Sequence, residues 1–325
     1  MSDIRRRRLL LAAGAMLTAP LALAQAPARK YRVGVLLASA PGLERYRAAL
    51  VERLASHGFV ESRNLQIDAR GSAGIFHEDR DTARAMLAAK ADALFTFANR
   101  PTQAALSATK SVPVVFTWVG DPIAAAIVKN YARPGGNATG VTTRFGELLV
   151  KRAELVRDLL PRSRRIAVLF WKSDEAFPAL APALRNVAAQ LGIELLEIDI
   201  SSWDTALDHA VKSGAEAVLP FWQFGASPVS ADVVIQHANR LRVPVVFAEA
   251  EPVDRGGLIS WGTNLVDDVR RGADMLARVL KGAKPADLPV DQAARFELVV
   301  NLKTAKAIGL SISQTVLLRA DRVIE

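Results

Sequence analysis

The residues best suited to chemistry in this 325-residue sequence are tryptophans, acids and small polar residues that follow short apolar runs. In chain order they are Ser39, Asn99, Thr102, Trp118, Asp121, Trp171, Trp222, Glu249 and Asn264. Indole rings stack on flat apolar molecules and attract quaternary ammonium groups. Asp121 and Glu249 add negative charge, and the hydroxyl and amide groups add neutral hydrogen bonds. The set favours noncovalent capture of an aromatic, amino-acid-like or cationic small molecule.

Motifs for catalysis are missing from the sequence. It contains no Gly-rich dinucleotide fingerprint between a strand and a helix, no P-loop, no His-Glu-x-x-His and no Gly-x-Ser-x-Gly elbow. The absence of cysteine excludes thiol catalysis, and the four histidines have no metal-ligand spacing. We therefore expect a protein that is not an enzyme and that uses neither a cofactor nor a metal.

Each candidate residue also has a simpler interpretation. A polar residue after a strand can cap the following helix, as Asn99 to Thr102 could do, and a large ring can close off the end of a lobe. The argument for a binding site therefore rests on the joint pattern, since four of the five tryptophans follow predicted strands.

The elements that would position these residues alternate between strand and helix. In the first run we expect strands at 33–37, 65–69, 93–97 and 113–116, and helices at 44–57, 79–90, 102–109 and 123–132. In the second run we expect strands at 165–170, 194–198, 217–219 and 244–247, and helices at 179–191, 205–213 and 230–241. The tail adds strands at 257–261 and 296–300, helices at 265–280 and 302–308, and a final segment at 314–324.

This alternation predicts an α/β fold with two Rossmann-like lobes, each built on a parallel sheet. The glycine-rich segment 135–143 lies between the two runs, and a strand and a helix are left over after them. We expect crossings near Thr142–Thr143, Thr263–Asn264 and Lys284–Val290. One lobe would then comprise residues 25–143 plus 264–284, and the other 144–263 plus 285–325. Ligands of open parallel sheets bind at the carboxyl ends of the strands, where the candidate residues fall.

The first 24 residues have the order of a cleaved signal peptide. Arg5 to Arg8 precede a short apolar run, and Ala22-Leu23-Ala24 supplies the small residues of a cleavage site. The arginine run also fits a twin-arginine signal, although the general secretory route fits as well. We expect a periplasmic protein, and the lack of cysteine excludes a lipid anchor.

The net charge of +9 falls to +6 once this segment is removed. The remaining basic residues are dispersed along the chain, whereas nucleic-acid binding requires a clustered basic face. We therefore expect no nucleic-acid partner.

Several motifs along the mature chain resemble one family of ABC transporter substrate-binding proteins, which includes tryptophan-binding receptors. The motifs are residues 33–36, 54–61, 112–116, 120–122, 132–141, 151–155, 280–290, 296–310 and 319–321. The resemblance implies the type I periplasmic binding protein architecture, hinge crossings between the lobes and an ABC permease as membrane partner. Relatives often carry an acid where this chain has Asn264, and its loss argues against a plain amino acid as ligand.

The resulting hypothesis is a monomeric receptor that captures a small molecule between two lobes and delivers it to an ABC permease. A ligand-sensing protein that docks on a signalling membrane protein would share the same fold. An enzyme that uses the crevice between the lobes is a further alternative. A transcription factor is disfavoured, because the N-terminus holds a signal in place of a helix-turn-helix.

Overall fold

The computed structural model describes residues 29–37, 43–71, 76–171, 176–200, 203–221 and 230–325. Its first sheet contains β1 (Tyr31–Leu37), β2 (Leu65–Gly71), β3 (Ala93–Phe97), β4 (Val114–Val119), β5 (Ala138–Thr142) and β11 (Asp291–Gln292). The strands lie in the order β11-β5-β4-β3-β1-β2, and every pairing is parallel. Strands β3, β4 and β5 are buried along their whole length, as expected for a sheet covered on both faces.

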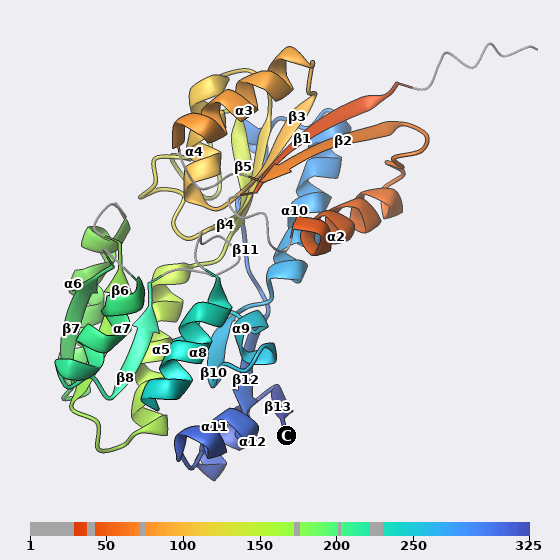
Figure 1. Ribbon diagram of the computed structural model, residues 1–325. Helices are drawn as coiled ribbons and strands as arrows, with labels where there is room; N and C mark the ends of the chain where they lie inside the picture. The colour runs from red at the N-terminus through yellow and green to blue at the C-terminus, as the bar shows by residue number, and fades with distance from the viewer. Residues whose placement is uncertain (1–28, 38–42, 72–75, 172–175, 201–202, 222–229) are drawn as a thin grey trace, which may run out of the picture. The chain divides into compact units, whose positions relative to one another are not determined.

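Helices cover this sheet on its two faces. They are α2 (Leu43–Ser56), α3 (Phe76–Ala88), α4 (Asn99–Ala108) and α10 (Leu265–Leu280). Helix α10 comes from far along the chain, yet it lies beside α2 and the strands of this sheet (Figure 1). Its Val269 and Leu276 share a core with Leu50 and Phe95. Gly272 permits this approach, because a Cβ there would lie 2.9 Å from the Phe95 ring.

The second sheet is assembled from two groups of strands. Strands β6 (Arg165–Phe170), β7 (Glu194–Asp199) and β8 (Ala217–Pro220) form the parallel order β7-β6-β8. Strands β9 (Val246–Phe247), β10 (Ile259–Thr263), β12 (Phe296–Asn301) and β13 (Arg322–Ile324) form the order β13-β12-β10-β9. A parallel bridge between Val218 and Val245 connects the groups. Among the described strands of this sheet, β10 and β12 form the one antiparallel pair, and β13 is parallel to β12.

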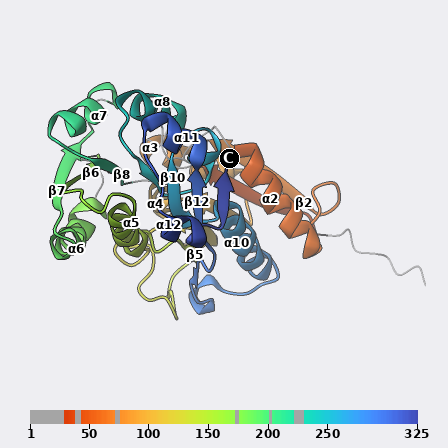
Figure 2. The ribbon, with the colours of Figure 1, turned by 90° about the horizontal axis from the view of Figure 1, so that it is seen from below.

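The helices that pack on the second sheet supply one large apolar core. They are α5 (Phe145–Leu159), α6 (Ala176–Gln190), α7 (Trp203–Lys212), α8 (Ala231–Leu241), α9 (Glu251–Asp254), α11 (Leu302–Ile308) and α12 (Gln314–Arg319). Figure 2 shows β10, β12 and the C-terminal strand side by side, with α11 and α12 close to them. Among the described residues, none of the helices combines the length and apolar character needed to span a bilayer.

The last stretch before β12 belongs to the first sheet, which differs from the predicted boundary at residue 285. The short helix η2 (Pro285–Asp287) lies beside β5, and Leu288 O accepts a hydrogen bond of 2.8 Å from Thr139 Oγ1. Strand β11 then pairs with β5. The chain passes to the second sheet only between Gln292 and Phe296, later than the predicted crossing at Lys284–Val290.

One expected helix was wrong, and one observed helix was not predicted. Residues 123–132 form turns instead of a helix, because Asp121 Oδ1 accepts hydrogen bonds from the backbone N–H groups of Ile123 and Ala124. Ala126 is left-handed, with φ +53°, which interrupts any helix there. Helix α5 was not predicted, although Leu148, Arg152 and Val156 occupy one buried stripe at helical spacing.

Candidate functional site

The carboxyl ends of β3 and β4 are held in strained backbone conformations. Ala98, after β3, has φ +67°, and Trp118, the second-to-last residue of β4, has φ +59°. Left-handed geometry is unfavourable for residues with a Cβ, and it persists where surrounding contacts enforce it. Two strained residues therefore lie at the sheet edge where the sequence places a ligand, although left-handed residues also occur elsewhere, at Lys90 and Arg242 for example.

Trp118 lies in the core at this edge. Its side chain is only 2% exposed, and Nε1 donates a hydrogen bond of 3.3 Å to Leu265 O. The indole packs edge-on against Tyr46 and Phe97, with ring centroids 4.5 and 4.8 Å apart. The ring closes off the end of the sheet, which is the simpler interpretation weighed from the sequence.

The other predicted residues of the first sheet bond within this edge. Thr102 Oγ1 is buried and donates to Ala98 O at 2.7 Å, while Asn99 Oδ1 accepts from Gly120 N at 3.3 Å. Asp121 holds the turn that follows β4, as described above. Each of these side chains thus stabilises the strand ends. Ser39 lies outside the described residues.

The predicted residues of the second sheet are placed differently. Trp171 is partly buried and packs against the second core, and Trp222 lies outside the described residues. Asn264 caps α10, since its Oδ1 accepts from Asp267 N at 3.1 Å.

Glu249 is only 3% exposed and lies just beyond the carboxyl end of β9. The Ala248 carbonyl lies so close to Gly262 that a Cβ there would come within 1.5 Å, which fixes the backbone beside Glu249.

Sequence reasoning missed one buried residue, Arg152, whose charge interacts with that of Glu249. Arg152 of α5 is completely buried, and its guanidinium carbon sits 4.6 Å from the centre of the Phe145 ring. Phe145 in turn packs edge-on against Phe221, which follows β8, at 5.3 Å. Burial lowers the pKa of Arg152 to about 9, while the charge of Glu249 raises it. Arg152 is therefore cationic at neutral pH.

Tyr46 of α2 reaches the same region from the first sheet. Its Oη donates to Glu251 Oε2 at 3.5 Å. Burial raises the pKa of Tyr46, and the charges of Glu251 and Glu249 raise it further. Tyr46, Arg152, Glu249 and Glu251 together form what we call the charged cluster, which lies at the carboxyl ends of the second sheet's strands.

A buried acid marks the crossing from β10 to α10. Asp268 is 2% exposed, and burial raises its pKa to about 7. Nearby, Arg271 Nη2 forms an ion pair of 2.6 Å with Asp291 of β11. The crossing thus carries a carboxyl group that titrates near neutrality.

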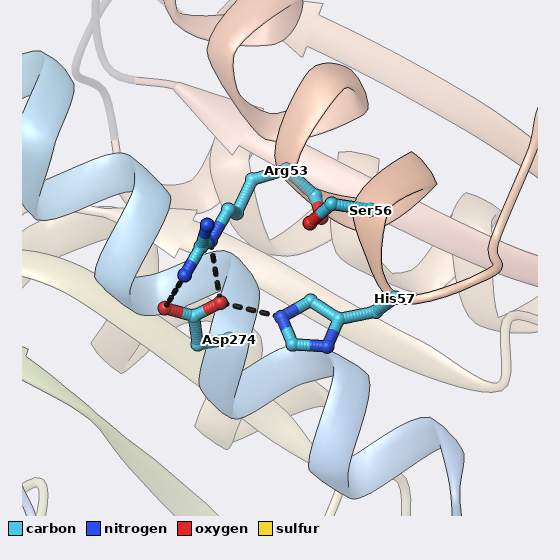
Figure 3. A network of polar contacts seen from close by, with 4 residues as sticks. All are labelled: Arg53, Ser56, His57 and Asp274. Carbon is cyan, nitrogen blue, oxygen red and sulfur yellow. Dashed lines mark hydrogen bonds and ion pairs between the residues drawn. The ribbon is translucent and has the colours of Figure 1, made fainter.

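A separate polar network fixes α10 to α2 (Figure 3). Both carboxylate oxygens of Asp274 accept hydrogen bonds from the Arg53 guanidinium, at 2.7 and 3.1 Å. His57 Nε2 lies 2.5 Å from Asp274 Oδ1. Ser56 Oγ donates to Arg53 O at 2.6 Å. Burial raises the pKa of Asp274, but the hydrogen bonds and charges of Arg53 and His57 outweigh it, and the net pKa is lowered. The network is about one-third exposed and anchors the helix.

Two surface cavities, of about 440 and 740 Å³, lie at the opposite end of the second sheet. Both are lined by Pro161, Arg162 and Ser163, which precede β6. Neither includes a predicted site residue. No group of three or more histidines and acids within the described part of the chain could hold a metal ion.

Comparisons with known proteins agree with this architecture. The model of the family described as ABC transporter substrate binding protein matches residues 32–324. The fold is that of type I periplasmic binding proteins. The chain belongs to the family of ABC transporter substrate-binding proteins.

Three proteins are similar to this chain in sequence or in structure. A tyrosine-binding protein of Clostridioides difficile (strain R20291) is 26% identical over 272 residues, which cover 83% of this chain and 78% of that protein. A Streptococcus pneumoniae ABC domain in complex with L-Trp superposes with a TM-score of 0.81 at 26% identity. A conserved domain protein of Vibrio cholerae O1 biovar El Tor superposes with a TM-score of 0.82 at 28% identity. Each structural match covers 91% of this chain and all of the other.

Proposed function

We propose that this protein is the receptor of an ABC importer, which captures a small molecule between two lobes and delivers it to a membrane permease. Three chain crossings support the proposal: from β5 to α5, from β10 to α10 and from β11 to β12. Crossings between two parallel-sheet lobes are suited to act as hinges. On this division, residues 31–143 with 264–292 form one lobe, and residues 144–263 with 293–325 form the other.

Closure would follow from contacts that the ligand makes with both lobes. Only the closed state offers both sets of contacts, so ligand binding shifts the population toward closure. The hydrogen bond between Tyr46 and Glu251 already joins the two proposed lobes at the carboxyl ends of their strands. The observation that carries the proposal is therefore the family match together with polar groups gathered at these ends.

The proposal includes export to the periplasm. The segment that would direct it, residues 1–24, lies outside the described residues, and the twin-arginine route remains a prediction. N-terminal sequencing of the mature protein should begin near residue 25. Replacing Arg6 and Arg7 by lysine should block export if the twin-arginine route is used, and leave it unchanged if the general secretory route is used.

The small-molecule function is tested by native mass spectrometry of the protein purified from its source without denaturation. A noncovalent adduct of small mass, released on unfolding and chemically unchanged, is the expected result. A chemically converted product would support an enzyme, and a protein that retains and binds no small molecule would contradict the receptor. L-Tyr and L-Trp are the first ligands to add, because similar proteins bind them.

A ligand sensor is the second candidate, because it would share the fold and the binding step. Capture by an ABC permease in membranes or nanodiscs, dependent on ligand, separates the two. Binding to the permease supports the importer, whereas binding to a signalling membrane protein alone supports the sensor.

A further inference from the structure

The side chain of Arg152 has an environment that is unusual for a buried cation. Nε donates to Leu148 O at 3.3 Å within its own helix. Neither Nη1 nor Nη2 has a hydrogen-bond partner in the described part of the chain, although both are buried. The four N–H groups of Nη1 and Nη2 are thus desolvated without a bond to any described residue.

This arrangement is costly in the absence of another group. An isolated buried charge loses several kcal/mol of hydration, and contact with an aromatic face returns only a part of it. The Phe145 ring occupies one face of the guanidinium, which leaves its N–H edge as the side that can donate. An anion with two oxygens matches that edge, because carboxylates accept paired parallel bonds from arginine.

The location of Arg152 agrees with ligand binding. Phe221 follows β8 and packs against Phe145, and Glu249 follows β9 and raises the pKa of Arg152. Phe221 and Glu249 both lie just beyond the carboxyl ends of their strands, which is the side of a parallel sheet where ligands bind. All of these residues follow strands of the second sheet or lie on helix α5, which packs on it. They therefore come from one proposed lobe.

Building on the proposed function, we propose that Arg152 binds the carboxylate of the ligand, which is an amino acid whose ammonium group faces Glu249. The charge of Glu249 acts on the buried Arg152 guanidinium, so the two side chains offer the opposite charges that a zwitterion carries. This assignment replaces the cationic ligand considered from the sequence. It also removes the objection drawn from Asn264, because Glu249 provides the acid that Asn264 does not.

The experiment measures affinity by calorimetry for the twenty common L-amino acids and then for the decarboxylated amine of each one that binds, such as tyramine for L-Tyr. The wild-type protein should bind the amino acid at least tenfold more tightly than the amine. Arg152→Gln should weaken amino-acid binding about 100-fold, or about 2.7 kcal/mol, and change amine binding less than threefold. Arg152→Lys keeps the positive charge but loses the paired N–H groups of the guanidinium. Its affinity for the amino acid should lie between those of the wild type and Arg152→Gln.

Lys151→Gln is the matched control, because Lys151 is the exposed neighbour on the same helix and pairs with Glu154. It should bind like the wild type. Equal binding of amino acid and amine by the wild type overturns the assignment without any variant, which covers the case in which Arg152→Gln fails to fold. A folded Arg152→Gln protein with unchanged amino-acid affinity overturns it as well.

Failure of this inference differs from failure of the proposed function. If the protein retains a small molecule without a carboxylate and binds no amino acid, the receptor function stands and the role of Arg152 is wrong. If it binds no small molecule of any kind, both are wrong.

Discussion

The two sheets end differently at their carboxyl edges. At the first sheet, Thr102, Asn99 and Trp118 all bond to neighbouring backbone groups, although the buried Thr117 Oγ1 makes no hydrogen bond to a described residue. At the second sheet, the charged cluster buries Arg152, whose terminal nitrogens make no hydrogen bond to any described residue. The contrast supports the proposal that the ligand binds at the second edge, although both edges follow the same strand-and-helix pattern.

Among the substitutions that test this comparison, Trp118→Ala should have the largest effect on stability, and it shows whether the first edge is part of the core. Removing a buried indole from contact with Tyr46 and Phe97 should lower the free energy of unfolding by about 3–5 kcal/mol. Chemical denaturation followed by circular dichroism measures the change. Ligand affinity of the fraction that remains folded should stay within a few-fold of wild type. A stable variant that has lost binding would move Trp118 from the core to the recognition surface.

The next largest effect on stability is expected at Asp268, in the crossing from β10 to α10. The pKa of Asp268 is raised to about 7, so the native state binds its proton more tightly than the unfolded chain does. Its contribution is fully present below pH 4, and the free energy of unfolding declines by roughly 2–4 kcal/mol as pH rises to 7. Asp268→Asn should remove this decline.

Denaturation curves from pH 4 to 8 for the wild type and Asp268→Asn provide the measurement. Asp267→Asn is the matched control, because Asp267 is adjacent and less buried. It should keep most of the decline, slightly reduced, because the charge of Asp267 contributes to the raised pKa of Asp268. Parallel pH profiles for the wild type and Asp268→Asn would show that Asp268 titrates at its ordinary pKa and does not respond to burial.

The smallest effect concerns the anchor of α10 on α2 (Figure 3). Asp274→Asn removes the ion pairs with Arg53 and His57 from a site that is about one-third exposed. The loss of stability should be within about 1 kcal/mol and should shrink in 1 M salt. Asp81→Asn, which breaks an exposed pair on α3, is the control with an effect near zero. A loss above about 2 kcal/mol that salt does not change would show that the network is buried in solution.

Most of the architecture could be predicted from hydrophobic periodicity. Strands 93–97 and 165–170 and helices 265–280 and 302–308 have the predicted bounds, because each is a clear apolar run or stripe with a distinct end. Helix 123–132 was wrong because a side-chain cap at Asp121 and a left-handed Ala126 outweigh local propensity. The boundary at 285 was misplaced because pairing of β11 with β5 is a long-range contact with no local signal.

The candidate site was harder to predict than the fold. Polar residues were expected to face a ligand because they follow strands, yet those of the first sheet bond to their own backbone. Arg152 was overlooked because charged residues are rarely buried, and its adjacent Lys151 is exposed. Its place on the buried stripe with Leu148 and Val156 is the signal that could have found it.

Small-angle X-ray scattering of the mature protein, without ligand and with the small molecule identified by native mass spectrometry, tests the central claim most directly. Capture between two hinged lobes predicts a smaller radius of gyration in the bound state, with no change in molecular mass. Saturating binding that leaves the radius of gyration and the scattering profile unchanged would contradict hinge closure.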